Sequence, residues 1–185
     1  MQLQNMDAPI ISVITVCYNV ASTIEKTMLS VLNQTYKNLE YIIIDGNSTD
    51  GTVDIIKKYA ERLTFWISEP DKGIYDAMNK GIVKATGKFL IFMNAGDQFL
   101  NEKVLSKCLP YFLQEIDVIS GIGYLSGQKW IPAKATDLSV AFFLKRSLNH
   151  QATFINRKLF QDNLYRTDLK IVGDSVSVSY THLRA

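Results

Sequence analysis

Four short runs of mostly apolar residues divide the first half of the chain. The segment Ile10–Cys17 is β-branched and apolar at most positions, which is typical of a central strand covered by helices on both faces. Leu39–Ile44, Phe65–Ser68 and Lys88–Met93 follow a similar pattern. Each run is followed by turn-forming residues such as Gly, Pro, Asn or Asp. The pattern therefore predicts four strands.

Between these runs, apolar residues recur at helical spacing. Ser22 and Glu25 are spaced as a capping box, which predicts that a helix of about a dozen residues begins there. The same periodicity predicts three further helices, over residues 53–60, Ile74–Ala85 and Glu102–Phe112. Gly87 stands where a glycine commonly ends a helix.

Strand and helix thus alternate four times along the chain. This alternation predicts an α/β fold with a mostly parallel central sheet and helices on both faces, because parallel strands need crossover connections. Beyond Asp117 the pattern is less regular and predicts a hairpin over Gly123–Trp130, an apolar segment Val140–Leu144 and a strand Gln151–Ile155. A chain of 185 residues is expected to form one domain.

Composition narrows the class of protein. The chain is 47% hydrophobic with a formal net charge of +2, which is ordinary for a globular protein and argues against a nucleic-acid partner. No segment has the length and hydrophobicity of a membrane span, so we expect no integral membrane protein, whereas peripheral membrane association stays open. Cys17 and Cys108 match no disulfide or zinc spacing, which favours a cytoplasmic location.

Polar side chains follow each of the four predicted strands. They are Tyr18 with Asn19, then Asp45, Asp71 and Asp97. Ligands of open parallel sheets bind outside the carboxyl ends of the strands. Carboxylates gathered at one edge repel one another, and a bound cation or a donor-rich ligand would relieve that repulsion.

Each of these residues also has a purely structural interpretation. Asp45 precedes a glycine and is equally a turn former, Asp50 and Asp71 precede helices and can cap them, and His150 is typical of a hydrogen-bonded structural histidine. The sequence contains no dinucleotide glycine fingerprint, phosphate-loop lysine or serine nucleophile elbow. The remaining candidate ligand is a nucleoside diphosphate held by a metal ion and strand-end acids.

Four motifs, in order, resemble those of family 2 glycosyltransferases, which are inverting enzymes with the GT-A fold: Ser12–Asn19, Asp45–Thr52, Asp71–Gly81 and Gly87–Asp97. The resemblance covers residues 10–174, and its last motif is similar to the branch that builds bacterial exopolysaccharides such as colanic acid. It implies transfer of a sugar from a UDP- or GDP-sugar to a saccharide or lipid-linked acceptor of surface polysaccharide synthesis. Such an enzyme would act in the cytoplasm, at the inner face of the membrane.

The resemblance also implies roles for individual residues. Asp45 would hydrogen-bond the base, since a carboxylate accepts the N–H groups of uracil or guanine. Other residues would contact the nucleotide: Thr15, Cys17, Tyr18, Asn19 and Asp71. Asp97 would hold Mg²⁺ or Mn²⁺, although Gly96 stands where the usual Asp-x-Asp motif has a metal ligand. Because a hard cation can keep several waters, one carboxylate and the diphosphate are enough to bind it.

The resemblance places the catalytic base at Asp174, which would accept the proton of the acceptor hydroxyl during inverting transfer. Asn79 and His150 are further candidate site residues. Residues 1–174 are expected to form the GT-A domain, and 175–185, which lack the helix pattern of the family, a non-native or unstructured tail. Two alternatives are a truncated nucleotide-sugar-binding remnant without transfer activity and a sugar nucleotidyltransferase, although the glycine-rich basic loop of the latter is absent from the sequence.

Overall fold

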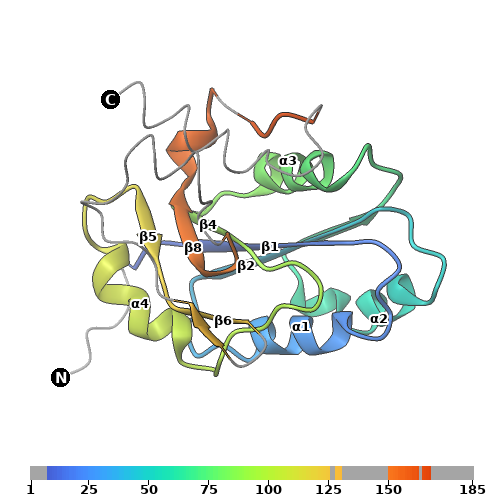
Figure 1. Cartoon of the computed structure of the whole chain (residues 1–185), viewed down its shortest axis with the longest axis horizontal. Coiled ribbons are helices and arrows are strands. Elements are labelled where there is room, and N and C mark those ends of the chain that lie inside the picture. The colour runs from blue at the N-terminus through green and yellow to red at the C-terminus, as the bar shows by residue number, and fades with distance from the viewer. Residues whose placement is uncertain (1–7, 126–127, 131–149, 163, 168–185) are drawn as a thin grey trace.

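A central six-stranded sheet organises the computed structural model, which describes residues 8–125, 128–130, 150–162 and 164–167 (Figure 1). The strand order is β3-β2-β1-β4-β8-β5. The bounds are β1 (Ile11–Cys17), β2 (Leu39–Asp45), β3 (Phe65–Ser68), β4 (Phe89–Phe92), β5 (Val118–Ser120) and β8 (Thr153–Asn156). β1, β2, β3 and β4 are mutually parallel, whereas β8 runs antiparallel to β4 and β5. The four predicted strands are confirmed, and the sheet is mostly parallel as expected.

Four helices cover the two faces of the sheet. They are α1 (Ile24–Leu32), α2 (Thr52–Lys58), α3 (Ile74–Lys84) and α4 (Val104–Phe112), as the helical periodicity predicts. In Figure 1, α3 lies on one side of the sheet, and α1, α2 and α4 lie on the other. Shorter elements complete the described chain: the 3-10 helices η1 (Ala60–Arg62), η3 (His150–Ala152) and η4 (Arg157–Phe160) and the hairpin strands β6 (Gly123–Leu125) and β7 (Gln128–Trp130).

The central strand β1 explains why the sheet has a core on each face. All seven of its residues are buried. Ile11 and Val13 belong to the core shared with α1, α2 and α4, and Ile14 and Val16 belong to the core shared with α3. Because side chains of a strand alternate between its faces, a strand covered on both sides is mostly apolar, and the buried Ser12 and Thr15 of β1 are hydrogen-bonded.

Three local expectations are wrong. The capping box does not form: Thr23 is the N-cap of α1 without a side-chain cap bond, and the Glu25 carboxylate accepts a hydrogen bond from the Tyr59 hydroxyl at 2.8 Å instead. The last predicted strand starts at Thr153 rather than Gln151, because 150–152 form η3. The predicted hairpin is confirmed by the pairing of β6 with β7, and the apolar segment 140–144 lies outside the described residues.

The third wrong expectation is that Gly87 ends a helix, because α3 ends before it, with Ala85 as its C-cap. The glycine allows a close backbone approach instead. A Cβ at this position would lie 2.5 Å from Ser12 Oγ and 2.8 Å from the carbonyl oxygen of Ile10. No side chain fits in that space, so a glycine is required for β1 and the start of β4 to meet.

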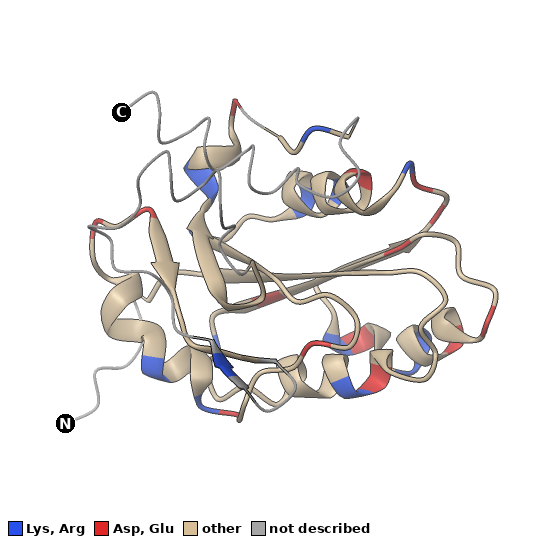
Figure 2. Cartoon of the chain, in the orientation of Figure 1, with Lys and Arg blue, Asp and Glu red and all other residues tan. Residues whose placement is uncertain are grey.

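The helices carry charge on their outer surfaces. Figure 2 shows acidic and basic positions beside each other on α1 and α2. Within the described ranges, no helix is long and apolar enough to cross a membrane.

A buried carboxylate joins three segments at the amino end of the parallel strands. Glu40 of β2 accepts hydrogen bonds from Ser12 Oγ at 2.5 Å, from the Thr86 amide at 2.9 Å and from the Thr86 hydroxyl. The Gly87 amide donates to it at 3.3 Å. Burial by itself raises the pKa of Glu40, but the hydrogen bonds from Ser12, Thr86 and Gly87 outweigh burial and bring the pKa below its ordinary value.

We expect Glu40→Gln to lower the free energy of unfolding at pH 7 by about 1–2 kcal/mol, because charge-assisted hydrogen bonds are lost. Since the folded-state pKa is lowered, the carboxylate stabilises the fold above the ordinary pKa of 4.5, and this contribution disappears as the pH falls through the folded-state value. Urea denaturation at several pH values measures the difference. Glu115→Gln is the control, because the Glu115 side chain is 97% exposed; an equal loss in both variants contradicts the prediction.

Candidate functional site

The carboxyl ends of the four parallel strands meet at one edge of the sheet. Cys17 at the end of β1 is in register with Asp45 at the end of β2, and Asp45 is in register with Ser68 at the end of β3. β4 pairs in parallel with the other side of β1. The loops that carry Tyr18, Asn19, Asp45, Asp71 and Asp97 therefore leave the sheet at the same edge, as the sequence predicts.

Asp45 has no solvent exposure, and its carboxylate accepts hydrogen bonds from the loop that follows it. Oδ2 accepts hydrogen bonds from the Ser48 amide at 2.9 Å and the Ser68 hydroxyl at 2.6 Å, and Oδ1 accepts one from the Ser48 hydroxyl at 2.5 Å. Both oxygens are thus used within the protein. Asp45 thus fixes the loop on which the edge of the site is built, and its predicted hydrogen bond to a base stays a prediction.

Thr15 and Cys17 lie beneath the candidate site and do not line it. Thr15 is fully buried, with its hydroxyl 3.0 Å from the Tyr41 hydroxyl and donating to the Met93 carbonyl at 2.7 Å. The Cys17 thiol is 3.5 Å from Asp45 Oδ1, and burial, followed by the nearby Asp45 carboxylate, strongly raises its pKa. Both residues are buried because β1 is covered on both faces to its last residue, and their predicted contacts with the nucleotide stay predictions.

The two loops after β1 and β2 are joined by hydrogen bonds. The Asn19 amide donates to Ser48 Oγ at 2.7 Å, and the Thr49 amide donates to Asn19 Oδ1 at 2.9 Å. Asn19 has a φ of 51°, a conformation that Asn adopts more readily than most residues. Asn19 therefore holds the loops after β1 and β2 together, and it is exposed at the edge where the candidate site lies.

Asp50 extends the same network and caps α2, as its structural interpretation predicts. Its carboxylate accepts hydrogen bonds from the Ala21 amide at 2.9 Å, the Thr52 amide at 3.0 Å and the Thr52 hydroxyl at 2.6 Å. The hydrogen bond from Ala21, followed by those from Thr52, holds the pKa of Asp50 below its ordinary value. The loop before α1 is thereby tied to the start of α2.

Tyr18, Gly46 and Asp71 form a contiguous surface at this edge. A Cβ on Gly46 would lie 2.6 Å from Asp71 Oδ2 and 3.4 Å from the Tyr18 ring, so the absence of a side chain at 46 lets the carboxylate lie over the backbone. Asp71 Oδ1 accepts a hydrogen bond from the Gly73 amide at 2.8 Å, which orients the carboxylate in the turn before α3. Tyr18 is 62% exposed. A planar ring and an acceptor thus stand together at the surface.

Asp97 follows β4 in a tight turn. Its amide donates to the Asn94 carbonyl at 2.9 Å, and Gly96 has a φ of +106°, a region that L side chains rarely adopt. The turn therefore requires glycine at the position where the usual motif has an acid. This explains why the chain has a single acid in this turn.

The Asp97 carboxylate is partly buried, and a segment far away in sequence lies against it. Burial raises the pKa of Asp97 above its ordinary value, while a hydrogen bond with the Gln151 side chain and the nearby His150 ring oppose the shift. His150 Nε2 is 3.1 Å from Asn94 Nδ2. The structure thus brings His150 to the predicted metal acid. It adds Asn94, which lies in the fourth motif, and Gln151, which starts the last predicted strand, and the sequence analysis gives neither of them a role.

The oxygen atoms of this turn fit a hard divalent cation. Asn94 Oδ1 is buried and has no hydrogen-bond partner within the described part of the chain, and Asp97 supplies a carboxylate. Carboxylate and amide oxygens are ligands that Mg²⁺ and Mn²⁺ accept. The described residues contain no group of three or more His, Cys, Asp or Glu side chains able to hold a metal, so further ligands would come from diphosphate and water.

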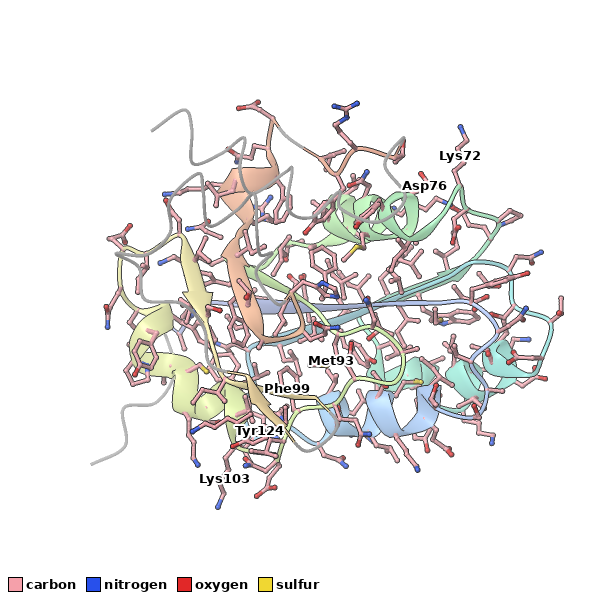
Figure 3. The ribbon with its side chains drawn as sticks, viewed as in Figure 1. Lys72, Asp76, Met93, Phe99, Lys103 and Tyr124 are labelled. Atoms are coloured by element: carbon pink, nitrogen blue, oxygen red, sulfur yellow. The ribbon has the colours of Figure 1, made fainter. Side chains whose placement is uncertain are left out.

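Asn79 lies outside this cluster. The Asn79 side chain donates to the Tyr165 carbonyl and accepts from the Tyr165 amide, both at 2.9 Å, which joins α3 to the segment after η4. The side chain of Asn79 therefore has a structural role, and the site role that the sequence suggests for it stays a prediction. Nearby, the Lys72 amide donates to Asp76 Oδ2 at 3.0 Å, and the Lys72 side chain extends away from α3 (Figure 3). Asp174 lies outside the described residues.

Comparisons with known proteins point to one family. The family model described as glycosyl transferase family 2 matches residues 12–173. A Mycobacterium bovis protein named PGL/p-HBAD biosynthesis glycosyltransferase is 34% identical over 161 residues, which are 84% of this chain and 62% of that protein. A Bacillus subtilis protein named putative teichuronic acid biosynthesis glycosyltransferase TuaG is 37% identical over 119 residues, covering 63% of this chain and 47% of the relative. This chain thus spans less than two thirds of the length of these relatives.

Solved structures show the same fold. TarS 1-349 of S. aureus in complex with UDP superposes with a TM-score of 0.77 at 20% identity, covering 94% of this chain and 55% of that one. The mannosyltransferase PcManGT of Pyrobaculum calidifontis, in complex with GDP-Man and Mn²⁺, gives a TM-score of 0.74 at 21% identity, with coverages of 95% and 52%. The predicted GT-A fold class is therefore confirmed.

We expect Asp45→Ala to lower the free energy of unfolding by at least about 2 kcal/mol, because the Ser48 and Ser68 donors are left without their acceptor. Thermal or urea unfolding measures this loss. Asp54→Ala is the control, because the Asp54 side chain is 80% exposed and contacts only Lys57, at 3.7 Å, among the ion pairs of the described residues. A stable Asp45→Ala protein would show that this buried network is dispensable.

Proposed function

Because this chain belongs to glycosyl transferase family 2, we propose that it forms the donor-binding part of an inverting glycosyltransferase that uses a UDP- or GDP-sugar. One observation carries the proposal: two chemically different groups lie on loops at the same edge of the sheet. The first is the Tyr18 ring with the Asp71 carboxylate, and the second is the partly buried Asp97 beside the Asn94 amide oxygen. A nucleoside diphosphate has a planar base at one end and an anionic diphosphate at the other. The two halves of the edge match these two ends in chemical character.

Asp71 and Tyr18 are proposed to bind the base. The Tyr18 ring is exposed and offers a stacking face, and the Asp71 carboxylate beside it accepts N–H groups. The Asp45 carboxylate already accepts hydrogen bonds from Ser48 and Ser68, so we place the principal acceptor for the base at Asp71. Both uracil and guanine present an N–H donor to a carboxylate, and the complexes of TarS with UDP and of PcManGT with GDP-Man support either nucleotide.

Asp97 and Asn94 are proposed to hold Mg²⁺ or Mn²⁺. A bound divalent ion neutralises the diphosphate and so makes it a better leaving group. The residues of this chain orient that ion: the turn at Gly96 fixes Asp97, and His150 fixes the Asn94 amide. The Mn²⁺ in the PcManGT complex supports the use of a divalent ion with the nucleotide sugar.

Asp174 is proposed as the base that accepts the proton of the acceptor hydroxyl, while that oxygen attacks the anomeric carbon from the face opposite the diphosphate. Residues 1–174 would form the GT-A domain and 175–185 a tail outside it. The proposed acceptor is a saccharide or lipid-linked saccharide of bacterial surface polysaccharide synthesis, at the inner face of the membrane. The teichuronic acid name of the Bacillus subtilis relative supports this role, and neither relative's name selects the colanic acid branch.

We expect Asp71→Asn to weaken binding of UDP or GDP by about tenfold or more, because a charge-assisted hydrogen bond to the base is lost. The amide oxygen of Asn still accepts from Gly73, so the loop keeps its anchor. Isothermal titration calorimetry measures the affinity. Asp76→Asn, five positions later on α3, is the matched control; equal affinities of the wild-type and Asp71→Asn proteins would remove Asp71 from the base.

The metal proposal has its own test. Mn²⁺ is expected to tighten the binding of UDP or GDP to the wild-type chain, and Asp97→Asn is expected to reduce that gain by about tenfold or more, because a neutral amide is a weaker ligand for a hard cation. Titrations with and without Mn²⁺ measure the gain. Asp117→Asn, an acid near β5 that pairs with Lys158, is the control. A full Mn²⁺ gain in Asp97→Asn would place the ion elsewhere.

A further inference from the structure

A row of polar side chains on α1 faces the loop that carries Asp97. Thr27, Ser30 and Gln34 are spaced three and four residues apart, so they lie on one side of the helix and the turn after it. Thr27 has no solvent exposure and Gln34 has 4%. Buried polar groups are costly unless they are hydrogen-bonded, so the partners of these residues determine their purpose.

All three side chains bind the backbone of the segment that runs from the end of β4 into the first turn of α4. The bonds run from the Gly96 amide to Thr27 Oγ1 at 2.9 Å, from the Phe99 amide to Ser30 Oγ at 3.3 Å, from the Leu105 amide to Gln34 Oε1 at 3.1 Å and from Gln34 Nε2 to the Asn101 carbonyl at 2.8 Å. Phe99 also belongs to the core shared with α1. Figure 3 shows Met93, at the end of β4, and Phe99 in this part of the molecule.

Thr27 differs from the other two because of the amide that it binds. Its partner is Gly96, the residue with a φ of +106° that directly precedes Asp97. The backbone torsions at Gly96 are only weakly restricted by the residue itself, because glycine has more accessible conformations than any other residue. The Gly96 amide belongs to the peptide between Ala95 and Gly96, so the Thr27 hydroxyl fixes the chain on one side of Gly96, and the bond from the Asp97 amide to the Asn94 carbonyl fixes it on the other. Together, these two bonds set where the Asp97 side chain starts.

We propose that Thr27 is a positioning residue that acts through Gly96 to aim the Asp97 carboxylate at the metal-diphosphate end of the donor site. The proposal rests on the proposed function, since it presupposes that Asp97 binds a cation. It also explains a polar side chain with no exposure on a helix whose neighbouring residues Met28 and Val31 are core. α1 follows the loop that carries Tyr18, so one helix would connect the base end of the site to its metal end.

The test compares two pairs of side chains that differ by the hydroxyl. Thr27→Val replaces the hydroxyl of the wild-type residue with a methyl group, and Thr27→Ala differs from Thr27→Ser by the hydroxyl alone. Titration calorimetry with UDP and with GDP, in the presence and absence of Mn²⁺, gives the Mn²⁺ gain for each protein, and thermal unfolding gives its stability. Ser30→Ala is the matched control, because it removes a hydroxyl-to-amide bond from the same helix and loop away from Asp97.

We expect Thr27→Val and Thr27→Ala to lower the Mn²⁺ gain by about tenfold, with metal-free affinity changed by less than about twofold. Thr27→Ser and Ser30→Ala are expected to keep the gain. If Thr27→Val does not fold, the Thr27→Ala and Thr27→Ser pair decides. Equal Mn²⁺ gains within either folded pair overturn the positioning role. A wild-type chain that binds neither UDP nor GDP, or binds them without a Mn²⁺ gain, overturns the proposed function itself before any variant is compared.

Discussion

Parallel pairing of β1 with β2 on one side and β4 on the other is the constraint on which the rest of the structure depends. It brings the ends of the strands to one edge and obliges each connection to cross a face of the sheet as a helix. The crossings bury β1 completely, so its residues become core up to Cys17. Chemistry at this edge is therefore left to the loops, where Tyr18 is the first exposed residue after the strand.

Two buried carboxylates hold this arrangement at opposite ends of β2. Glu40 collects donors from β1 and from the turn before β4, and Asp45 collects donors from its own loop and from β3. A buried carboxylate is tolerated only when hydrogen bonds replace its lost hydration. Each acid thus selects one arrangement of the segments around it. The site owes its shape to side chains that do not reach its surface.

The sequence predicts the parts of this protein that follow from periodicity and chain order. The four parallel strands, the four helices and the gathering of Tyr18, Asp71 and Asp97 at one edge are all of this kind. Burial and partner choice were not predictable in the same way: Asp45 reads as a ligand or a turn former, and only three-dimensional contacts show its oxygens used by Ser48 and Ser68. Gln151 was missed because a distant segment brings it to Asp97.

The close approach of Asp71 to Gly46 has a consequence for how this surface can vary. A side chain at 46 and the carboxylate at 71 claim the same volume, since a Cβ would lie 2.6 Å from Asp71 Oδ2. The two positions are consequently coupled: any side chain introduced on the loop after β2 has to displace the one supplied by the loop after β3. A side chain at 46 therefore becomes possible only after the one at 71 has been shortened or has moved, so this corner of the surface can change in one order of substitutions and not in the other.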